Sequence, residues 1–383
     1  MKDFKKTLFM DEAANGKGHN ALTEMLIALV LFFISSVAMG IVQVPVLVIY
    51  LVNNKDYMSM LMSGNIDSEK MLSVLSNMPE WVMIDMLFAE ILLTIVVLLY
   101  CRFIEKRRLS TLGFVKNGMA KQYFLGLITG AAAFSAAYLI CVVTGGVRFE
   151  GLNKEITSLY IIGFFFGYIL QGMAEEVLCR GYLMVSLSRR YHVTQAIIVS
   201  SLFFAFLHFS NSGFSLLAFI NLFLFGVFAS LLLLEFGNIW IAGAFHSVWN
   251  FVQGNIYGIQ VSGTNKSSSV FVTSNVAGRE IINGGSFGME GGLSVTFILA
   301  LGIVLLFYLL YKRGDIIDIK EQQEQVVDAM QEIKAADNSS DSTDNLNTDN
   351  SDIDNVDAFV DSYTSDNDTS TQKTVFDENY FKD

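Results

Sequence analysis

Long apolar segments separated by short polar connections dominate the chain. A helix that crosses a bilayer needs about 20 consecutive, mainly apolar residues. Eight segments reach or approach that length, and the fifth and the seventh of them are short. Their approximate ranges are 23–50, 81–103, 122–144, 158–186, 194–210, 214–235, 239–257 and 293–311. This pattern predicts an all-α, polytopic membrane protein with about eight transmembrane helices.

Basic residues gather on alternate connections between these segments. Clusters of Lys and Arg lie in 2–17, 102–121, 189–190 and 312–313, whereas the connections 53–79 and 145–157 hold two basic residues each. Short cytoplasmic flanks of membrane helices are enriched in Lys and Arg. Eight spans with both termini in the cytoplasm satisfy every cluster. We therefore expect a multi-pass protein of the cell membrane in this orientation.

Composition agrees with a membrane protein and isolates its negative charge in the C-terminal tail. The chain is 52% hydrophobic and only 16% charged, with a mean hydropathy of +0.47, whereas soluble domains carry about 25% charged residues. Residues 335–383 hold 13 acids and two lysines, while residues 1–334 hold 24 acids and 23 bases. The tail is too polar to fold and is expected to be disordered. No basic surface for nucleic acid is expected, and a partner for the tail stays unknown.

These boundaries define four regions, of which the third lies within the second. Residues 1–20 form a cytoplasmic N-terminus, 21–313 an eight-helix membrane domain, 258–292 an external loop rich in Gly and Ser, and 335–383 the acidic tail. The glycines near the end of the external loop do not predict a phosphate site, because no strand precedes them and an apolar segment follows.

The stretch MAEEVLCRG places ionisable residues at the end of an apolar run. Such residues are costly in a membrane and indicate a functional site. On a helix, Glu176 and Arg180 lie four residues apart on one face and can form a charge-assisted pair. Glu175 points elsewhere, and only Gln171 is polar among the positions three or four residues away. The spacing therefore predicts a structural pair at Glu176 and Arg180 and leaves Glu175 available for chemistry.

Two of the four histidines lie in apolar segments, His208 in the fifth and His246 in the seventh. A single histidine in a membrane helix is more often packed against a neighbouring helix than catalytic. Counted from the cytoplasmic helix ends, however, Glu175, His208, His246 and Asn250 lie roughly 12–20 Å deep. We expect these four side chains to converge in one cavity that opens toward the cytoplasm.

A carboxylate, two imidazoles and an amide can activate a water molecule and stabilise an oxyanion. The inferred reaction is hydrolysis of a peptide bond inside the bilayer by general-base catalysis, with or without a metal ion. Zinc is the candidate metal, with Glu175, His208 and His246 as candidate ligands, although no HExxH motif occurs. No binding residues for another cofactor are predicted.

Three ordered motifs resemble those of a known family. They are EExxxR from Glu175 to Arg180, FxxxH from Phe204 to His208, and HxxxN from His246 to Asn250. Together they resemble the CPBP intramembrane proteases, relatives of the CAAX prenyl endopeptidases, over about residues 80–312. The resemblance implies an eight-helix core with a membrane cavity reached from the cytoplasm. Its substrates would be membrane-associated or lipidated peptides or proteins.

The same resemblance implies roles for individual residues. Glu175 would activate water, while His208, His246 and Asn250 would surround the reacting carbonyl, and Glu176, Arg180 and Phe204 would support them. The alternatives are a non-catalytic membrane scaffold, such as a bacteriocin-immunity-type protein, and a proton-coupled transporter, although no internal repeat supports the latter. Glu90, near mid-membrane, is expected either to pair with Arg or a backbone group or to line the cavity.

Overall fold

The computed structural model describes residues 2–14, 18–65 and 67–318. The predicted tail, 335–383, lies outside the described residues. By their internal contacts the described residues divide into two units, one formed by residues 2–5 with 314–318 and the other lying within 6–313. In the first, the strands β1 (Lys2–Phe4) and β4 (Ile316–Asp318) pair antiparallel, with Lys2 opposite Asp318.

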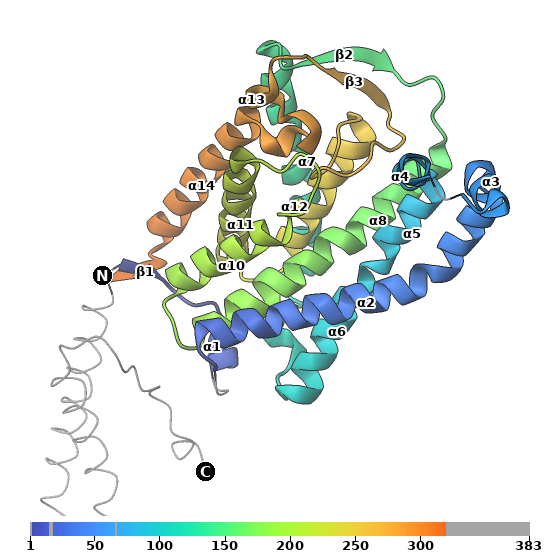
Figure 1. The fold of residues 1–383 in the computed structure, drawn as a ribbon. Coiled ribbons are helices and arrows are strands. Elements are labelled where there is room, and N and C mark those ends of the chain that lie inside the picture. Colours follow the sequence, from blue (N-terminus) through green and yellow to red (C-terminus); the bar gives the residue numbers. More distant parts are fainter. Residues whose placement is uncertain (1, 15–17, 66, 319–383) are drawn as a thin grey trace, which may run out of the picture. The chain divides into compact units, whose positions relative to one another are not determined.

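The second unit is a bundle of helices (Figure 1), which confirms the predicted all-α class of membrane protein. Its α-helices are α1 (Leu8–Ala14), α2 (Ala21–Asn53), α3 (Lys55–Ser63), α4 (Ser68–Ser76), α5 (Glu80–Ala89), α6 (Ile91–Leu99), α7 (Met119–Val143), α8 (Ser158–Glu176), α9 (Val185–Ser188), α10 (Val193–Leu207), α11 (Leu216–Phe236), α12 (Trp240–Phe251), α13 (Glu280–Asn283) and α14 (Leu293–Arg313). Its π-helices are η1 (Tyr100–Ile104), η3 (Val177–Met184) and η4 (Val252–Ile256), and its short 3₁₀ turns are η2 (Leu109–Leu112), η5 (Gly285–Phe287) and η6 (Met289–Gly291).

Each of the eight predicted apolar segments contains a helix. Within the described residues, six helical stretches are long and apolar enough to cross a membrane: 21–53, 80–104, 119–143, 158–188, 216–236 and 293–313. The two segments noted as short in the sequence fold as α10, of 15 residues, and as α12, whose 12 residues continue into the five-residue η4.

The external segment predicted as a loop contains regular structure. Strand β3 (Phe271–Asn275) pairs antiparallel with β2 (Val147–Leu152), and a bulge lies between Phe149 and Gly151. The helix α13 and the turns η5 and η6 follow before α14. In Figure 1 this ribbon lies at the same end of the bundle as α3 and α4, whereas α1 lies at the opposite end.

A glycine lets α8 approach α12 closely enough to build the site. A Cβ atom at Gly172 would lie 2.6 Å from the backbone nitrogen of Ser247, so any side chain there would push the two helices apart. Small residues permit the same close packing in other membrane helix pairs. The contact brings the end of α8, where the glutamate doublet lies, beside His246 on α12.

Candidate active site

The second glutamate of the doublet holds two helices together. Glu176 is fully buried, and its Oε1 accepts hydrogen bonds from Arg180 Nη1 at 3.1 Å and from His246 Nδ1 at 2.9 Å. Glu176 and Arg180 therefore form the pair that their spacing predicts. The Arg180 guanidinium also lies 4.6 Å from the ring centre of Phe204, a distance typical of a cation–π contact.

The first glutamate stands at the junction between α8 and the π-helix η3. Single π-turns inside α-helices occur frequently at functional sites. Glu175 Oε1 accepts a 2.6 Å hydrogen bond from Gln171 Nε2, and Gln171 Oε1 in turn accepts a 2.9 Å bond from Asn250 Nδ2. The amide orientations follow from this network. Gln171 is thus a neutral partner of Glu175, and it links the glutamate to Asn250.

The other oxygen of Glu175 faces two imidazoles. Glu175 Oε2 lies 4.0 Å from His208 Nε2 and 3.7 Å from His246 Nε2, and it accepts no hydrogen bond. His208 Nδ1 lies 2.9 Å from the carbonyl of Phe204, and His246 Nδ1 lies 2.9 Å from Glu176. Both partners are acceptors, so each Nδ1 carries a proton, and each Nε2 faces Glu175.

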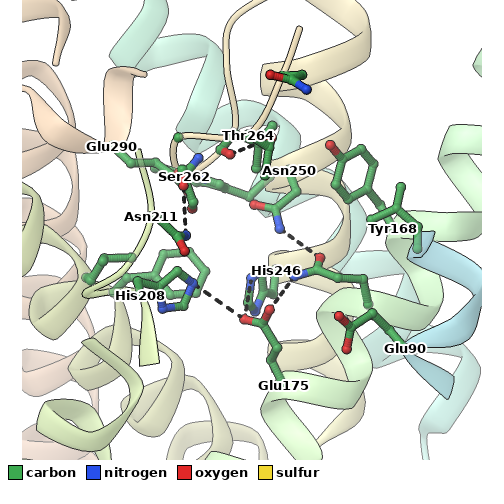
Figure 2. A pocket seen from close by; sticks show the side chains of 18 of the residues that line it. Glu90, Tyr168, Glu175, His208, Asn211, His246, Asn250, Ser262, Thr264 and Glu290 are labelled. Carbon is green, nitrogen blue, oxygen red and sulfur yellow. Dashed lines mark hydrogen bonds and ion pairs between the residues drawn. The ribbon is translucent and has the colours of Figure 1, made fainter. Parts of the chain in front are cut away.

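These side chains line a cavity of about 510 Å³. Figure 2 shows Glu175, His208 and His246 turned toward one another across it, with Asn250 beside them. The structure therefore brings together all four residues that the sequence predicted to converge. Glu90 also lines the cavity, which is one of the two positions expected for it.

The rim of the cavity is built from two connections between helices. Asn211 Nδ2, between α10 and α11, donates a 2.8 Å hydrogen bond to the carbonyl of Ser262. The carboxylate of Glu290 accepts hydrogen bonds from the backbone nitrogen of Ser262 at 2.7 Å and from its hydroxyl at 2.6 Å. These bonds hold Ser262 at a φ of 47°, which is uncommon for a residue other than glycine.

The position of this rim bears on the prediction of a cavity that opens toward the cytoplasm. Residues 211 and 261–265 lie at the helix ends opposite the basic clusters that predict the cytoplasmic face. The opening toward the cytoplasm and the orientation of the helices both stay predictions. The depths predicted by counting residues along each helix indicated that the four side chains lie at a similar level. They did not indicate at which end of the helices the cavity opens.

The comparison with known families falls on the same segment. Residues 157–252 match the family model described as type II CAAX prenyl endopeptidase, Rce1-like. The matched range contains all three motifs and every residue from Glu175 to Asn250 that faces the cavity. This segment is similar to Rce1-like domains. No curated protein matches the chain.

Imidazole nitrogens and carboxylate oxygens are ligand types that zinc takes in proteins. Ligand atoms 2.0–2.1 Å from a tetrahedral zinc lie about 3.3 Å from one another. The separations of 3.7 and 4.0 Å from Glu175 Oε2 are wider, and the described part of the chain holds no group of three His, Cys, Asp or Glu spaced for a metal. The ligand types fit zinc, but the spacing does not.

Several residues of the Rce1-like site and its rim were missed in the sequence. Gln171 carried a signal, because it is the one polar residue within a helical turn of Glu175. The contact between Ser262 and Glu290 carried none, since it joins residues 28 positions apart through a connection without helical or strand periodicity.

Proposed function

We propose that this protein is an intramembrane endopeptidase that hydrolyses a peptide bond with a water molecule activated by Glu175. The observation that carries the proposal is Glu175 Oε2, which accepts no hydrogen bond yet faces two imidazole nitrogens inside a cavity. A buried carboxylate oxygen without a donor is unfavourable unless water or substrate supplies one.

In the proposed reaction, water binds between Glu175 Oε2 and the two Nε2 atoms. Glu175 takes a proton from the water as its oxygen attacks the carbonyl carbon of the peptide bond. The oxyanion that forms accepts a hydrogen bond from the Nε2–H of whichever of His208 and His246 enters the reaction as an imidazolium, and that imidazolium keeps its proton throughout. The carbon–nitrogen bond then breaks, and the proton held by Glu175 moves to the leaving amine.

The remaining polar groups keep these atoms in position. The Gln171 bond fixes Oε1 of Glu175, so that Oε2 is the oxygen presented to water. Glu176 fixes the orientation of the His246 ring. The Oδ1 atom of Asn250 is buried without a hydrogen-bond donor and can accept one from the peptide N–H of a substrate.

Membrane-associated or lipidated peptides and proteins are the proposed substrates, and the cell membrane is the proposed location, with both termini in the cytoplasm. Zinc remains a prediction from residue types alone and has no step in this mechanism. Elemental analysis of the purified protein tests it.

The experiment compares membranes that contain the wild-type protein with membranes that contain Glu175→Gln. New peptide N-termini are labelled and identified in both samples, and Glu155→Gln, an exposed carboxylate outside the cavity, serves as the matched control. We expect cleavage products with the wild type and with Glu155→Gln only. A non-catalytic scaffold would instead leave the cellular phenotype of Glu175→Gln unchanged and yield no product that depends on Glu175.

A further inference from the structure

One wall of the cavity holds a carboxylate that the proposed reaction does not use. Glu290 lies in the turn η6, is only 7% exposed and lines the cavity. Its Oε2 accepts the two hydrogen bonds from Ser262, and its backbone carbonyl accepts one from Asn221 Nδ2 at 2.8 Å. Figure 2 shows Glu290 and Glu175 on opposite sides of the pocket. The two carboxylates would therefore contact different parts of a substrate.

The glycine-rich stretch before α14 determines where Glu290 lies. Gly288 has a φ of 90°, and a Cβ atom there would collide with the carbonyl oxygen of Gln260. Glycine adopts such positive φ values without steric cost. The backbone nitrogen of Gly263 also donates a 2.8 Å hydrogen bond to the carbonyl of Phe287. These contacts join the turn that carries Glu290 to the connection that carries Ser262.

The second carboxylate oxygen of Glu290 has no partner. Oε1 accepts no hydrogen bond from a described residue, yet it remains accessible. No described Lys or Arg pairs with Glu290, and none lines the cavity. A buried carboxylate without a cation is costly. Ser262, which binds the other oxygen, has a φ of 47°, and strained backbone of this kind gathers at ligand sites. The wall therefore lacks a cation that a ligand can supply.

We propose that Glu290 is a specificity-determining residue that binds the ammonium or guanidinium group of a lysine or arginine side chain in the substrate. The presence of a peptide in the cavity rests on the proposed function. An N–H of the cation donates to Oε1, while Oε2 keeps its bonds from Ser262. Charge-assisted hydrogen bonds of this type are short and strong. A neutral side chain of equal length leaves Oε1 without a donor and is rejected.

Paired peptides test this preference. The membrane-embedded peptide found by N-terminal labelling is resynthesised with an acetylated N-terminus, so that a side chain is the cation tested. Lysine or norleucine is placed in turn at each position that flanks the cleaved bond. Norleucine has a similar length and lacks the charge. The kcat/KM of each peptide is measured in liposomes for the wild type, for Glu290→Gln and for the control Glu155→Gln.

The wild type and Glu155→Gln should cleave the lysine peptide about 10–100-fold faster than the norleucine peptide at one position, and Glu290→Gln should bring that ratio to about one. Glutamine can still accept the bonds from Ser262, so the charge is the main change. If Glu290 only supported the fold, Glu290→Gln would lower both rates by one factor and keep the ratio, which overturns the proposal. Equal cleavage of both peptides by the wild type overturns it as well.

Chemical cross-linking locates the cation without any cleavage. Glu175→Gln in liposomes is mixed with a synthetic polyleucine span whose Gly-Ser tail carries one lysine, and a water-soluble carbodiimide then joins a carboxylate to a nearby amine. Mass spectrometry should find the link at Glu290, and adding Glu290→Gln should abolish it. A link at Glu90 alone, or no link, overturns the proposal. This probe does not depend on proteolysis, so failure of the subsite and failure of the proposed function are distinguishable.

Discussion

Replacing Glu176 by glutamine removes the negative charge that neutralises a fully buried arginine. Arg180 is 0% exposed, and its Nε and Nη2 atoms have no hydrogen-bond partner. Its remaining favourable contacts are the 3.1 Å bond to Glu176 and the face of the Phe204 ring. Breaking a buried ion pair by removing one partner costs about 3–5 kcal/mol, because the other charge stays buried and uncompensated.

The loss should appear in the stability of the purified protein. Unfolding in detergent, followed by helical circular dichroism against denaturant, should show Glu176→Gln destabilised by about 3–5 kcal/mol. The double variant Glu176→Gln with Arg180→Met removes both charges, and a buried pair replaced by uncharged residues is often neutral in stability. We therefore expect the double variant to recover most of the loss.

The pattern of the two variants decides between a buried charge and a local packing defect. A packing defect would make the double variant less stable than the single one, since two side chains are then altered. Equal stability of Glu176→Gln and the wild type would contradict the buried ion pair itself.

Three further predictions follow from the site and its packing. Gln171→Leu should lower kcat by about 10²-fold with little change in KM, because Glu175 loses the bond that fixes its carboxylate; an unchanged kcat in a steady-state assay would remove its positioning role. Gly172→Ala should destabilise the protein by about 1–3 kcal/mol through overpacking. Gly40→Ala, where an added Cβ meets no atom within 4 Å, should not change the stability. Equal melting temperatures of Gly172→Ala and the wild type would refute the close approach of α8 and α12. The cavity lining includes three glutamates but no described Lys or Arg, so peptides with a basic residue near the cleaved bond should be preferred over acidic ones. Equal cleavage of a basic and an acidic peptide in a paired-substrate competition would refute this.

Helix positions and the chemistry within one helix could be predicted from the sequence. Apolar length alone located the six described stretches that are long enough to cross a membrane, because the bilayer fixes the length of a helix. The spacing of Glu176 and Arg180 predicted their pair, since positions four apart on a helix lie on one face. The same reasoning noted Gln171 as the one polar neighbour of Glu175 but did not assign it a hydrogen bond.

The hydrogen bonds that join one helix to another were beyond that reasoning. The bond from His246 to Glu176 depends on how closely α8 approaches α12, which Gly172 allows but does not specify. The side of the membrane toward which the cavity opens depends on how several helices pack together, and no periodicity along a single segment records this. The predicted depths were therefore compatible with an opening on either side.

The most direct test of the central claim is the kcat/KM of purified, liposome-embedded protein on a membrane-embedded peptide identified by the N-terminal labelling experiment. Wild type and Glu155→Gln should cleave it equally, and Glu175→Gln should fall by about 10²–10⁴-fold with an unchanged melting temperature. Cleavage by Glu175→Gln at the wild-type rate would contradict the assignment of Glu175 as the group that activates water.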